Sequence, residues 1–533
     1  MTTLTSTTDT VTRDALAVLQ PGFAGTTAPD WLLRRVGEGL CSVGLFGRNI
    51  QTPEQLSALT AQLRAERDDV LVAIDEEGGD VTRLEVRHGS SFPGNLALGA
   101  VDDLGLTRAV AQELGRRLAE CGVNLNWAPS ADVNSNPGNP VIGVRSFGAD
   151  PRLVARHTAA YVEGLQAAGV AACTKHFPGH GDTAVDSHHA LPRIDVDLDT
   201  LHARELVPFR AAIAAGSKSV MSAHILLPAL DPDRPATLSP QILTGLLREE
   251  LGYDGLIVTD GMEMQAISST YGIERGSVLA IAAGADAICV GGGLDDEDTV
   301  LRLRDALVAA VRTGELPEER LADAAARVRA LASWTQRGAV PEPDAATKEG
   351  TAPGTGIASD IGLMAARRAV QVTGTAGPLT EPAYVAAFTP VANIAVGDET
   401  PWGVAAELTR ILPGTGTDTY NSETEAPVTA VLDAAGDRRI VAVVRDAHRH
   451  PWMTDAVDAL IAGRPDTVVV EMGVPQESPR GALYVATHGA ARVCGQAAAE
   501  AITGTPGPYG AGDGKGRTQF RGDSGPENQA RPA

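Results

Sequence analysis

The segment KHFPGHGDTAVDSHH, residues 175–189, concentrates side chains that can bind and release protons. It holds four histidines, two aspartates and one lysine in fifteen positions, directly after the apolar run VAAC at 170–173. Histidine exchanges protons near neutral pH, and a neighbouring carboxylate fixes which ring nitrogen carries the proton. Asp186 and His188 lie two positions apart on a loop that is rich in glycine. They form a candidate pair for general acid–base chemistry.

A metal site is the alternative explanation for this segment. The residues that could serve as ligands are His176, His180, His188, His189, Asp182 and Asp186. Their spacing does not match a metal motif such as HExxH on a helix, and the Gly and Pro residues among them indicate a loop. We therefore expect acid–base chemistry, with no metal and no other cofactor.

Short apolar runs alternate with amphipathic stretches through the first 300 residues. The runs are 42–46, 70–74, 123–127, 170–173, 219–222, 256–258 and 285–290. Strands that alternate with helices in this way favour an α/β fold with a parallel sheet closed into a (β/α)8 TIM-type barrel. An open doubly wound sheet is the structural alternative.

Ionisable residues follow five of these runs. They are Asp75, Asp132, the pair Lys175 and His176, His224, and Asp260. One aspartate after a strand often caps the next helix. In a barrel, however, the carboxyl ends of all strands meet at one face, which carries the active site. Five such positions therefore favour an active site over five separate caps.

A second domain is expected beyond a linker. Residues 337–357 lose the apolar periodicity and are rich in Pro, Gly and Thr, which is typical of linkers. Five strand candidates follow, at 369–372, 384–388, 440–444, 468–471 and 483–486. The sequence predicts a catalytic barrel at 1–336, a linker at 337–357, a smaller α/β sandwich domain at 358–503 and a disordered tail at 504–533.

Composition excludes several classes of function. The net charge of −23 argues against binding to nucleic acid, which depends on clustered Lys and Arg. No apolar run approaches the roughly 18 residues of a membrane helix. The N-terminus lacks the basic start and apolar core of a signal peptide, so we expect a cytoplasmic protein without membrane partners. The five scattered cysteines form no CxxC pair and are interpreted as small core residues. The oligomeric state stays open.

The segment KHFPGHGDTAVDSHHALP resembles the signature of the NagZ-like β-N-acetylglucosaminidase branch of glycoside hydrolase family 3. Similar segments occur in the family's order along the chain. They are GLFGRNIQTPEQL at 44–56, AIDEEGGDVTRL at 73–84, FPGNLALGA at 92–100, WAPSADVNSNPGNPVIGVRSFG at 127–148, VMSAHI at 220–225 and YDGLIVTDGMEM at 253–264. Together they cover most of residues 40–290.

The resemblance implies a role for each matched residue. Asp260 corresponds to the catalytic nucleophile, and Asp186 with His188 corresponds to an acid/base dyad that replaces a second carboxylic acid. The residues that would hold the hydroxyl groups of the terminal sugar are Asp75, Arg83, Arg145, Lys175 and His176. Asp132 would brace the Lys175–His176 pair or support the loop. His224 is a further candidate for support.

The implied activity is that of an exo-acting, retaining β-N-acetylglucosaminidase, also called a β-N-acetylhexosaminidase, that removes terminal GlcNAc. A carboxylate beside the anomeric carbon and a separate proton donor suit retention through a covalent intermediate. The resemblance also implies peptidoglycan recycling as the cellular role. One alternative is a phosphorylase, because an imidazole repels an incoming phosphate less than a carboxylate base does. The other is an inactive sugar-binding protein, which the intact Asp260, Asp186 and His188 argue against.

Some positions depart from the pattern of many relatives. IDEEGGDVTR stands where IDQEGGRVQR is common, so we expect Glu76 and Asp80 to add negative charge near the sugar-binding edge. Gly261 replaces a bulkier or acidic neighbour of the nucleophile. In the second domain, the polar segment RDAHRHPW at 445–452 either reaches the active site or forms a solvated loop.

Overall fold

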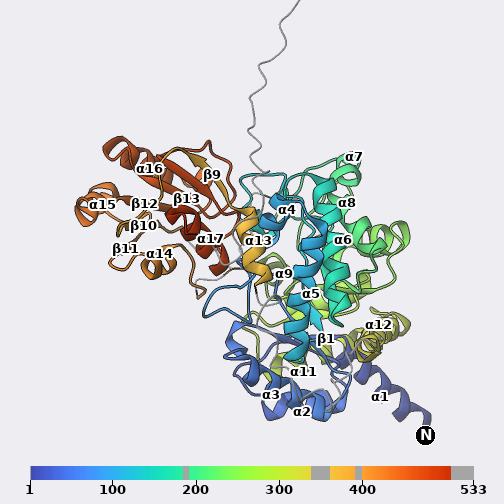
Figure 1. Ribbon diagram of the computed structural model, residues 1–533. Coiled ribbons are helices and arrows are strands. Elements are labelled where there is room, and N and C mark those ends of the chain that lie inside the picture. Colours follow the sequence, from blue (N-terminus) through green and yellow to red (C-terminus); the bar gives the residue numbers. More distant parts are fainter. Residues whose placement is uncertain (1, 184–190, 338–359, 391–395, 397–398, 506–533) are drawn as a thin grey trace, which may run out of the picture.

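Eight parallel strands alternate with helices in the first part of this computed structural model, which describes residues 2–183, 191–337, 360–390, 396 and 399–505 (Figure 1). The strands are β1 (Leu19–Pro21), β2 (Ser42–Leu45), β3 (Leu71–Ile74), β4 (Leu125–Asn126), β5 (Ala171–Phe177), β6 (Ser219–Ser222), β7 (Leu256–Thr259) and β8 (Ile288–Val290). Their carboxyl ends point the same way, which gathers the loops that follow them at one face.

The strands pair in chain order. β2 to β7 form one sheet of six neighbouring strands, a bridge from Val258 to Ala287 joins β7 to the segment before β8, and β8 pairs with β1. An open doubly wound sheet would depart from chain order, with its first strand in the middle. The observed order curls the sheet, and the predicted α/β barrel class is confirmed.

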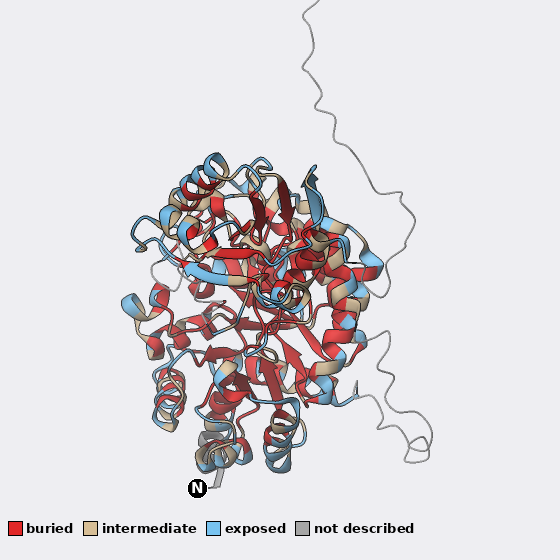
Figure 2. Ribbon diagram, turned by 60° about the vertical axis from the view of Figure 1, so that its left-hand side comes forward, coloured by how far each residue is buried: buried red, intermediate tan, exposed pale blue. Residues whose placement is uncertain are grey.

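Helices cover the outside of this sheet. Between successive strands lie α2 (Asp30–Glu38), α3 (Pro53–Glu66), α4 (Asn95–Val101), α5 (Leu104–Glu120), α6 (Pro151–Ala167), α7 (Leu198–Thr200), η3 (Leu201–Glu205), α8 (Leu206–Ala214), η5 (Gln241–Glu250), α9 (Gln265–Tyr271) and α10 (Ile273–Ala283), while α1 (Thr2–Ala17), α11 (Glu297–Thr313) and α12 (Glu318–Arg337) flank the barrel. Because helices cover them on the outside, every strand residue is buried (Figure 2). Continuous burial explains why these strands read as uninterrupted apolar runs.

One barrel strand escaped the sequence analysis. β1 is the tripeptide Leu19-Gln20-Pro21, too short and too polar to stand out as an apolar run. Its proline has no N–H to donate, and the next residue, Gly22, donates to the Val290 carbonyl at 2.7 Å. The tertiary pairing with β8 therefore defines this strand, and its own sequence does not.

The second domain contains a six-stranded sheet in the order β11-β10-β12-β13-β14-β9. Its elements are α13 (Ile361–Ala369), β9 (Gln371–Gly374), β10 (Tyr384–Phe388), α14 (Ala405–Ile411), β11 (Gly416–Tyr420), α15 (Pro427–Ala435), β12 (Ile440–Val444), α16 (Pro451–Gly463), β13 (Val468–Glu471), β14 (Leu483–Ala486) and α17 (Arg492–Thr503). Only β9 runs antiparallel to its neighbour. Four predicted strands match, β9 begins later because α13 extends to Ala369, and β11 was missed because this mostly exposed edge strand reads GTDTY.

Alternate residues of the central strands face opposite sides of this sheet. Val441 and Val443 of β12 belong to the core beneath α13, α14 and α17, whereas Ile440 and Ala442 belong to the core beneath α15 and α16. The sheet is thus covered on both faces, as expected of a sandwich domain. In Figure 1, α13 and α17 are the helices of this domain nearest to the barrel.

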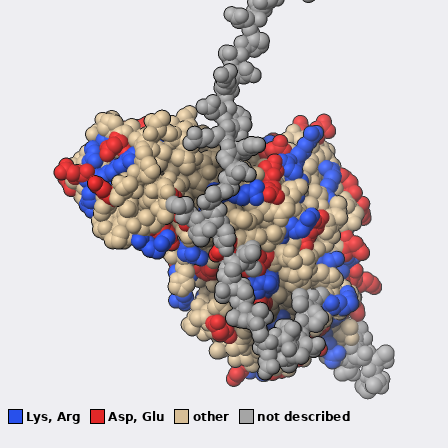
Figure 3. Space-filling view, in the orientation of Figure 1, with Lys and Arg blue, Asp and Glu red and all other residues tan. Residues whose placement is uncertain are grey.

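Several sequence-based expectations concern residues without a described structure. Of the predicted linker and the predicted tail, only residues 337, 504 and 505 lie within the described ranges, so the domain boundaries stay predictions. All five cysteines are buried and unpaired, which confirms their interpretation as core residues. Among the described helices, none has the length and apolar character needed to cross a membrane. On the face shown in Figure 3, acidic and basic side chains are interspersed.

Candidate active site

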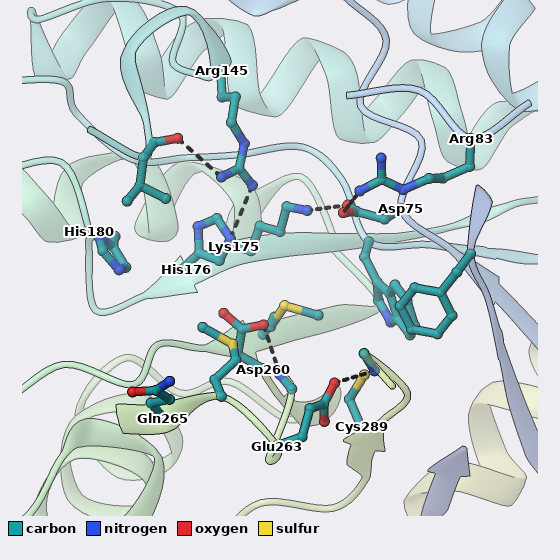
Figure 4. A pocket seen from close by; sticks show the side chains of 17 residues that line it. Asp75, Arg83, Arg145, Lys175, His176, His180, Asp260, Glu263, Gln265 and Cys289 are labelled. Atoms are coloured by element: carbon teal, nitrogen blue, oxygen red, sulfur yellow. Dashed lines mark hydrogen bonds and ion pairs between the residues drawn. The ribbon is translucent and has the colours of Figure 1, made fainter. Parts of the chain in front are cut away.

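A cavity of about 420 Å³ lies at the carboxyl ends of the barrel strands (Figure 4). Six residues to which the family resemblance gave a catalytic or sugar-binding role line it: Asp75, Arg83, Arg145, Lys175, His176 and Asp260. They come from the ends of β3, β5 and β7 and from the loop after β4. The structure therefore brings these six together, whereas Asp132 and His224 lie behind the cavity wall.

Lys175 is a buried cation held between two carboxylates. Its side chain is 2% exposed, and its Nζ lies 2.5 Å from Asp75 and 2.7 Å from Glu77. Burial by itself would lower the pKa of this lysine, but Asp75 and Glu77 outweigh it and raise the pKa above its ordinary value. Arg83 adds a longer contact to Asp75, at 3.4 Å. Lys175 and Asp75 thus offer the cavity a fixed donor and a fixed acceptor.

Glu77 joins Lys175 to Arg145. The Arg145 guanidinium binds Glu77 through two nitrogens, at 2.7 and 3.0 Å, and both side chains are nearly inaccessible to solvent. Burial alone would raise the pKa of Glu77, but the two cations hold it well below its ordinary value. Planar guanidinium–carboxylate pairing also fixes direction, so Glu77 orients Arg145 toward the cavity.

Asp132 holds His176. The carboxylate accepts hydrogen bonds from His176 Nδ1 at 2.7 Å and from the His176 backbone N–H at 3.2 Å. The pKa of this buried aspartate is lowered: burial opposes ionisation, and His176 outweighs it. Because Arg145 can only donate, its 3.4 Å contact makes His176 Nε2 the acceptor. The His176 ring is thereby fixed in one tautomer beside the cavity.

The loop after β5 begins as tightly packed structure. His180 lines the cavity, its backbone N–H donates to Asp132 at 2.7 Å, and burial lowers the pKa of its ring to about 4. Asn139 donates to the carbonyls of His180 and Gly181. A Cβ at Gly181 would lie 1.7 Å from the Val133 carbonyl, so only glycine fits there. Asp186 and His188, further along this loop, lie outside the described residues.

Asp260 faces the charged cluster from the opposite wall (Figure 4). Its backbone N–H donates to Ser222 of β6 at 3.2 Å, and its Oδ1 accepts from Gly261 N–H at 2.8 Å. His224 is fully buried and donates from Nε2 to the Gly261 carbonyl at 2.9 Å. Contacts with the adjacent strand and its loop therefore fix the position of the Asp260 carboxylate.

Two residues near the cavity were not singled out from the sequence. Glu77 was read as part of the IDEEGGD loop, and only the fold shows that it, in addition to Asp75, contacts Lys175. Glu263 also lines the cavity and accepts hydrogen bonds from the N–H groups of Gly291 and Gly292 after β8. Both are carboxylates in loops, where periodicity carries no information. A pair of acidic residues two positions apart after a strand, Asp75 and Glu77, was the one available hint.

The expectation for Glu76 was wrong. Its carboxylate does not add charge at the sugar-binding edge, because it turns into its own loop and accepts from Thr82, Arg83 N–H and Leu84 N–H at 2.7–3.1 Å. The side chain of Asn126 in β4 accepts a hydrogen bond from the Glu76 N–H and donates one to the Glu76 carbonyl. Burial raises the pKa of Glu76 to about 7. Glu76 therefore organises the loop that presents Asp75 and Arg83.

The expectation for Asp80 was also wrong. Asp80 is buried, and its carboxylate pairs with Arg445 of the second domain. Arg445 opens the polar segment 445–452, which continues as a 3-10 turn at Ala447–Arg449 and the start of α16, and none of its residues lines the cavity. A second contact of the segment joins His448 Nε2 to the Pro137 carbonyl, at 2.8 Å. The negative charge of Asp80 is thus paired with an arginine of the second domain.

The histidine-rich loop after β5 was the candidate for a metal site. In the parts of the chain that the structure describes, no three His, Cys, Asp or Glu side chains are grouped as metal ligands. His176 and His180 instead contact Asp132 and Thr183. These rings are engaged in hydrogen bonds that hold the loop.

Glu76→Gln should change how stability depends on pH. The pKa of Glu76 is about 7 in the folded protein and about 4.5 when solvated, so the fold favours the protonated form. This contribution is complete below about pH 4.5 and is lost as the pH rises through 7. We expect the free energy of unfolding of the wild type to fall by about 3 kcal/mol relative to the variant between pH 4.5 and 8.

Denaturation in urea at several pH values measures this difference. The matched control is Glu423→Gln, which alters an exposed glutamate in the second domain. Parallel curves for the wild type and Glu76→Gln would show that Glu76 ionises normally in the fold.

Known proteins are similar to this chain in fold and in sequence. The solved structure described as a glycoside hydrolase family 3 β-N-acetylglucosaminidase from Paenibacillus sp. str. FPU-7 is similar at a TM-score of 0.81 and 34% identity, covering 92% of this chain and 96% of that one. Beta-hexosaminidase A of Pseudoalteromonas piscicida is 39% identical over 312 residues, which are 54% of this chain and 52% of that protein. The chain thus spans about half the length of this relative.

A shorter relative is matched over more of its length. The Beta-hexosaminidase of Stenotrophomonas maltophilia (strain R551-3) is 38% identical over 280 residues, which are 50% of this chain and 82% of that protein. Residues 33–331 match the family model described as "Glycosyl hydrolase family 3 N terminal domain". That range contains the whole cavity and more than half of the chain. The chain is therefore a member of glycosyl hydrolase family 3.

Proposed function

We propose that this protein is an exo-acting, retaining β-N-acetylglucosaminidase that hydrolyses terminal β-linked GlcNAc through a covalent glycosyl-enzyme intermediate. The observation that carries the proposal is the two-sided cavity. Asp260 projects from one wall, and the cluster of Asp75, Lys175, Arg145 and His176 forms the other (Figure 4). A sugar held by that cluster presents its anomeric carbon to a carboxylate at a fixed position.

The charged wall suits the hydroxyl groups of a pyranose. Lys175 and Arg145 can only donate hydrogen bonds, and the Asp75 carboxylate can only accept them. Adjacent sugar hydroxyls both donate and accept, so they match alternating partners. Phe46 and Trp127 line the same cavity and offer apolar surface to a sugar ring. The names of the 34%-identical Paenibacillus enzyme and of the two hexosaminidases support GlcNAc as the sugar.

Each chemical step is assigned to a residue. Asp260 attacks the anomeric carbon while His188 protonates the leaving oxygen, so one glycosidic bond breaks and one ester bond forms. Water then attacks the anomeric carbon of this ester and gives a proton to His188; the bond from that carbon to Asp260 breaks, which restores the Asp260 carboxylate with net retention. Asp186 orients the imidazole and stabilises its charged form. The assignment of Asp186 and His188 rests on the sequence signature.

The cellular role follows from the resemblance. GlcNAc at the end of cell-wall fragments is the proposed natural substrate, and peptidoglycan recycling in the cytoplasm is the proposed process. The second candidate activity is phosphorolysis, in which phosphate replaces water. Phosphorolysis is a candidate because the proposed acid/base is an imidazole, which repels an incoming phosphate less than a carboxylate does.

Substrate specificity tests the proposal directly. With nitrophenyl glycosides, we expect kcat/KM for the β-GlcNAc compound to exceed that for the β-glucoside strongly. Analysis of the products with and without phosphate should give free GlcNAc in both cases. A sugar phosphate would assign the protein as a phosphorylase, and equal kcat/KM values for the two glycosides would place it in another branch of the family.

Asp260→Ala should abolish turnover. The nucleophile forms the only covalent bond to the sugar, so we expect kcat to fall at least about 10³-fold while the fold is kept. A 2-fluoro sugar with a good leaving group should label Asp260 in the wild type, as read by peptide mass spectrometry. Asp260→Asn serves as the isosteric control. A label on another residue would contradict the assignment.

His188→Ala should discriminate between leaving groups. Natural disaccharides need a proton on the leaving oxygen, so their cleavage should slow far more than that of a nitrophenyl glycoside. Azide needs no general base and should restore turnover of the activated substrate as a β-glycosyl azide. Asp186→Ala should show the same pattern more weakly. Equal losses on both substrates without azide rescue would point to His180, His189 or a carboxylate from elsewhere instead.

A further inference from the structure

The loop between β3 and α4, residues 75–94, connects the cavity to the second domain. Near its start lie Asp75 and Arg83, which line the cavity, and Glu77 behind them. Further along, Ser90 accepts from Val493 N–H, and Ser91 accepts from Arg492 at 2.8 Å. One loop thus carries sugar-facing charges and the docking contacts of α17.

Asp80 is the central contact of this loop. Its side chain is 2% exposed, one carboxylate oxygen pairs with Arg445, and the other accepts from Ala490 N–H at 2.7 Å. Both donors belong to the second domain, so both oxygens of a buried barrel carboxylate are satisfied from outside the barrel. The Trp402 ring lies 5.8 Å from the Arg445 guanidinium and helps to orient it. Without the second domain, the Asp80 carboxylate would lose both of its hydrogen-bond partners.

A tight hairpin transmits the position of Asp80 to Glu77. Glu77 N–H donates to the Val81 carbonyl at 3.1 Å, and Gly78 bridges Val81, so Asp80 sits in the turn. Gly79 adopts φ +67°, and a Cβ there would lie 2.6 Å from Gly94. The turn therefore has little room to deform. A shift of Asp80 must move Glu77, which holds both Arg145 and Lys175.

A second connection reaches the loop after β4. His448 donates to the Pro137 carbonyl at 2.8 Å, and Val474 lies beside Gly143. Val141 and Arg145, on the same loop, line the cavity. The second domain thus contacts both loops that contribute to the sugar-facing cluster, whose other members, Lys175 and His176, lie in β5. The opposite wall is built differently, because Asp260 is held by Ser222 and Gly261 of the barrel itself.

We infer that the second domain sets the sugar-binding geometry of the cavity through the Asp80–Arg445 pair. In this arrangement Asp80 and Arg445 are positioning residues that act on Glu77 and, through it, on Lys175 and Arg145. None of the described residues of the second domain lines the cavity. The inference rests on the proposed function for the identity of the sugar, and its mechanical part depends only on the contacts between the domains.

Arg445→Met, Asp80→Asn and the double variant form a thermodynamic cycle. Contacts to non-reacting hydroxyls act equally on the bound substrate and on the transition state, so their loss raises KM and spares kcat. We expect each single variant to raise KM for the GlcNAc glycoside about two- to thirtyfold, with kcat little changed. The double variant should resemble one single variant, because the two residues act through one contact.

Two further variants separate positioning from general stability. Arg445→Lys keeps the charge and should recover most of the wild-type KM. Arg368→Met removes another ion pair between the domains, a 2.8 Å contact to Asp103 at the start of α5 whose two side chains are largely exposed and do not line the cavity. It should leave KM unchanged. An additive cycle, or an equal KM for Arg445→Met and Arg368→Met, would overturn the inference.

Hydrogen exchange tests the mechanical part without any substrate. In Arg445→Met, amides of residues 77–84 should exchange faster than in the wild type, whereas in Arg368→Met they should not. Unchanged exchange in Arg445→Met would overturn the inference. A wild type that cleaves no GlcNAc glycoside, combined with faster exchange, would instead remove the proposed function and leave the positioning role standing.

Discussion

The buried pairing of Glu77 with Lys175 and Arg145 is the interaction on which the site depends. A lysine and an arginine cannot be kept charged inside a protein without a partner, because the cost of removing them from water is too large. Glu77 supplies that partner from a loop, and in return both cations are fixed beside the cavity. The arrangement converts flexible side chains into directed hydrogen-bond donors. Sugar recognition needs such direction, since hydroxyl groups differ only in where they point.

The barrel supports this pairing by delivering each side chain from a different strand end. β3 presents Asp75, β5 presents Lys175 and His176, and β7 presents Asp260. Behind them a layer of buried groups, above all Asp132 and His224, fixes rings and backbone without reaching the cavity. The two walls differ in how they are held. The wall that carries Asp260 is braced by neighbouring strands, whereas the opposite wall combines the end of β5 with the loops after β3 and β4. Loops need external support to keep a geometry, and here the second domain contacts both.

This difference gives the second domain a physical reason to exist beside a barrel that holds the proposed nucleophile. In an isolated barrel, Asp80 would lower the stability of the fold, because a buried carboxylate with neither of its hydrogen-bond donors is strongly unfavourable. With Arg445 and Ala490 in place it becomes an anchor. A departure from the family pattern at position 80 and an arginine at position 445 are therefore two halves of one contact. Neither residue is explained by its own neighbourhood in the sequence.

The sequence by itself determined the fold class, most of the strands and six of the charged or titratable residues that line the cavity. Buried parallel strands must be apolar along their whole length, and functional residues of a barrel follow the carboxyl ends of its strands. The apolar runs and the ionisable residues directly after them can therefore both be recognised in the sequence. Such recognition fails where a partner distant in sequence decides the structure. β1 is a strand because β8 lies beside it, and β11 is an edge that needs little apolar character. Glu76 and Glu77 are adjacent and identical in type, yet one is turned into its loop with a raised pKa and the other is ionised between two cations. Only the tertiary structure separates them, because the charge state of a carboxylate depends on the groups that surround it in space.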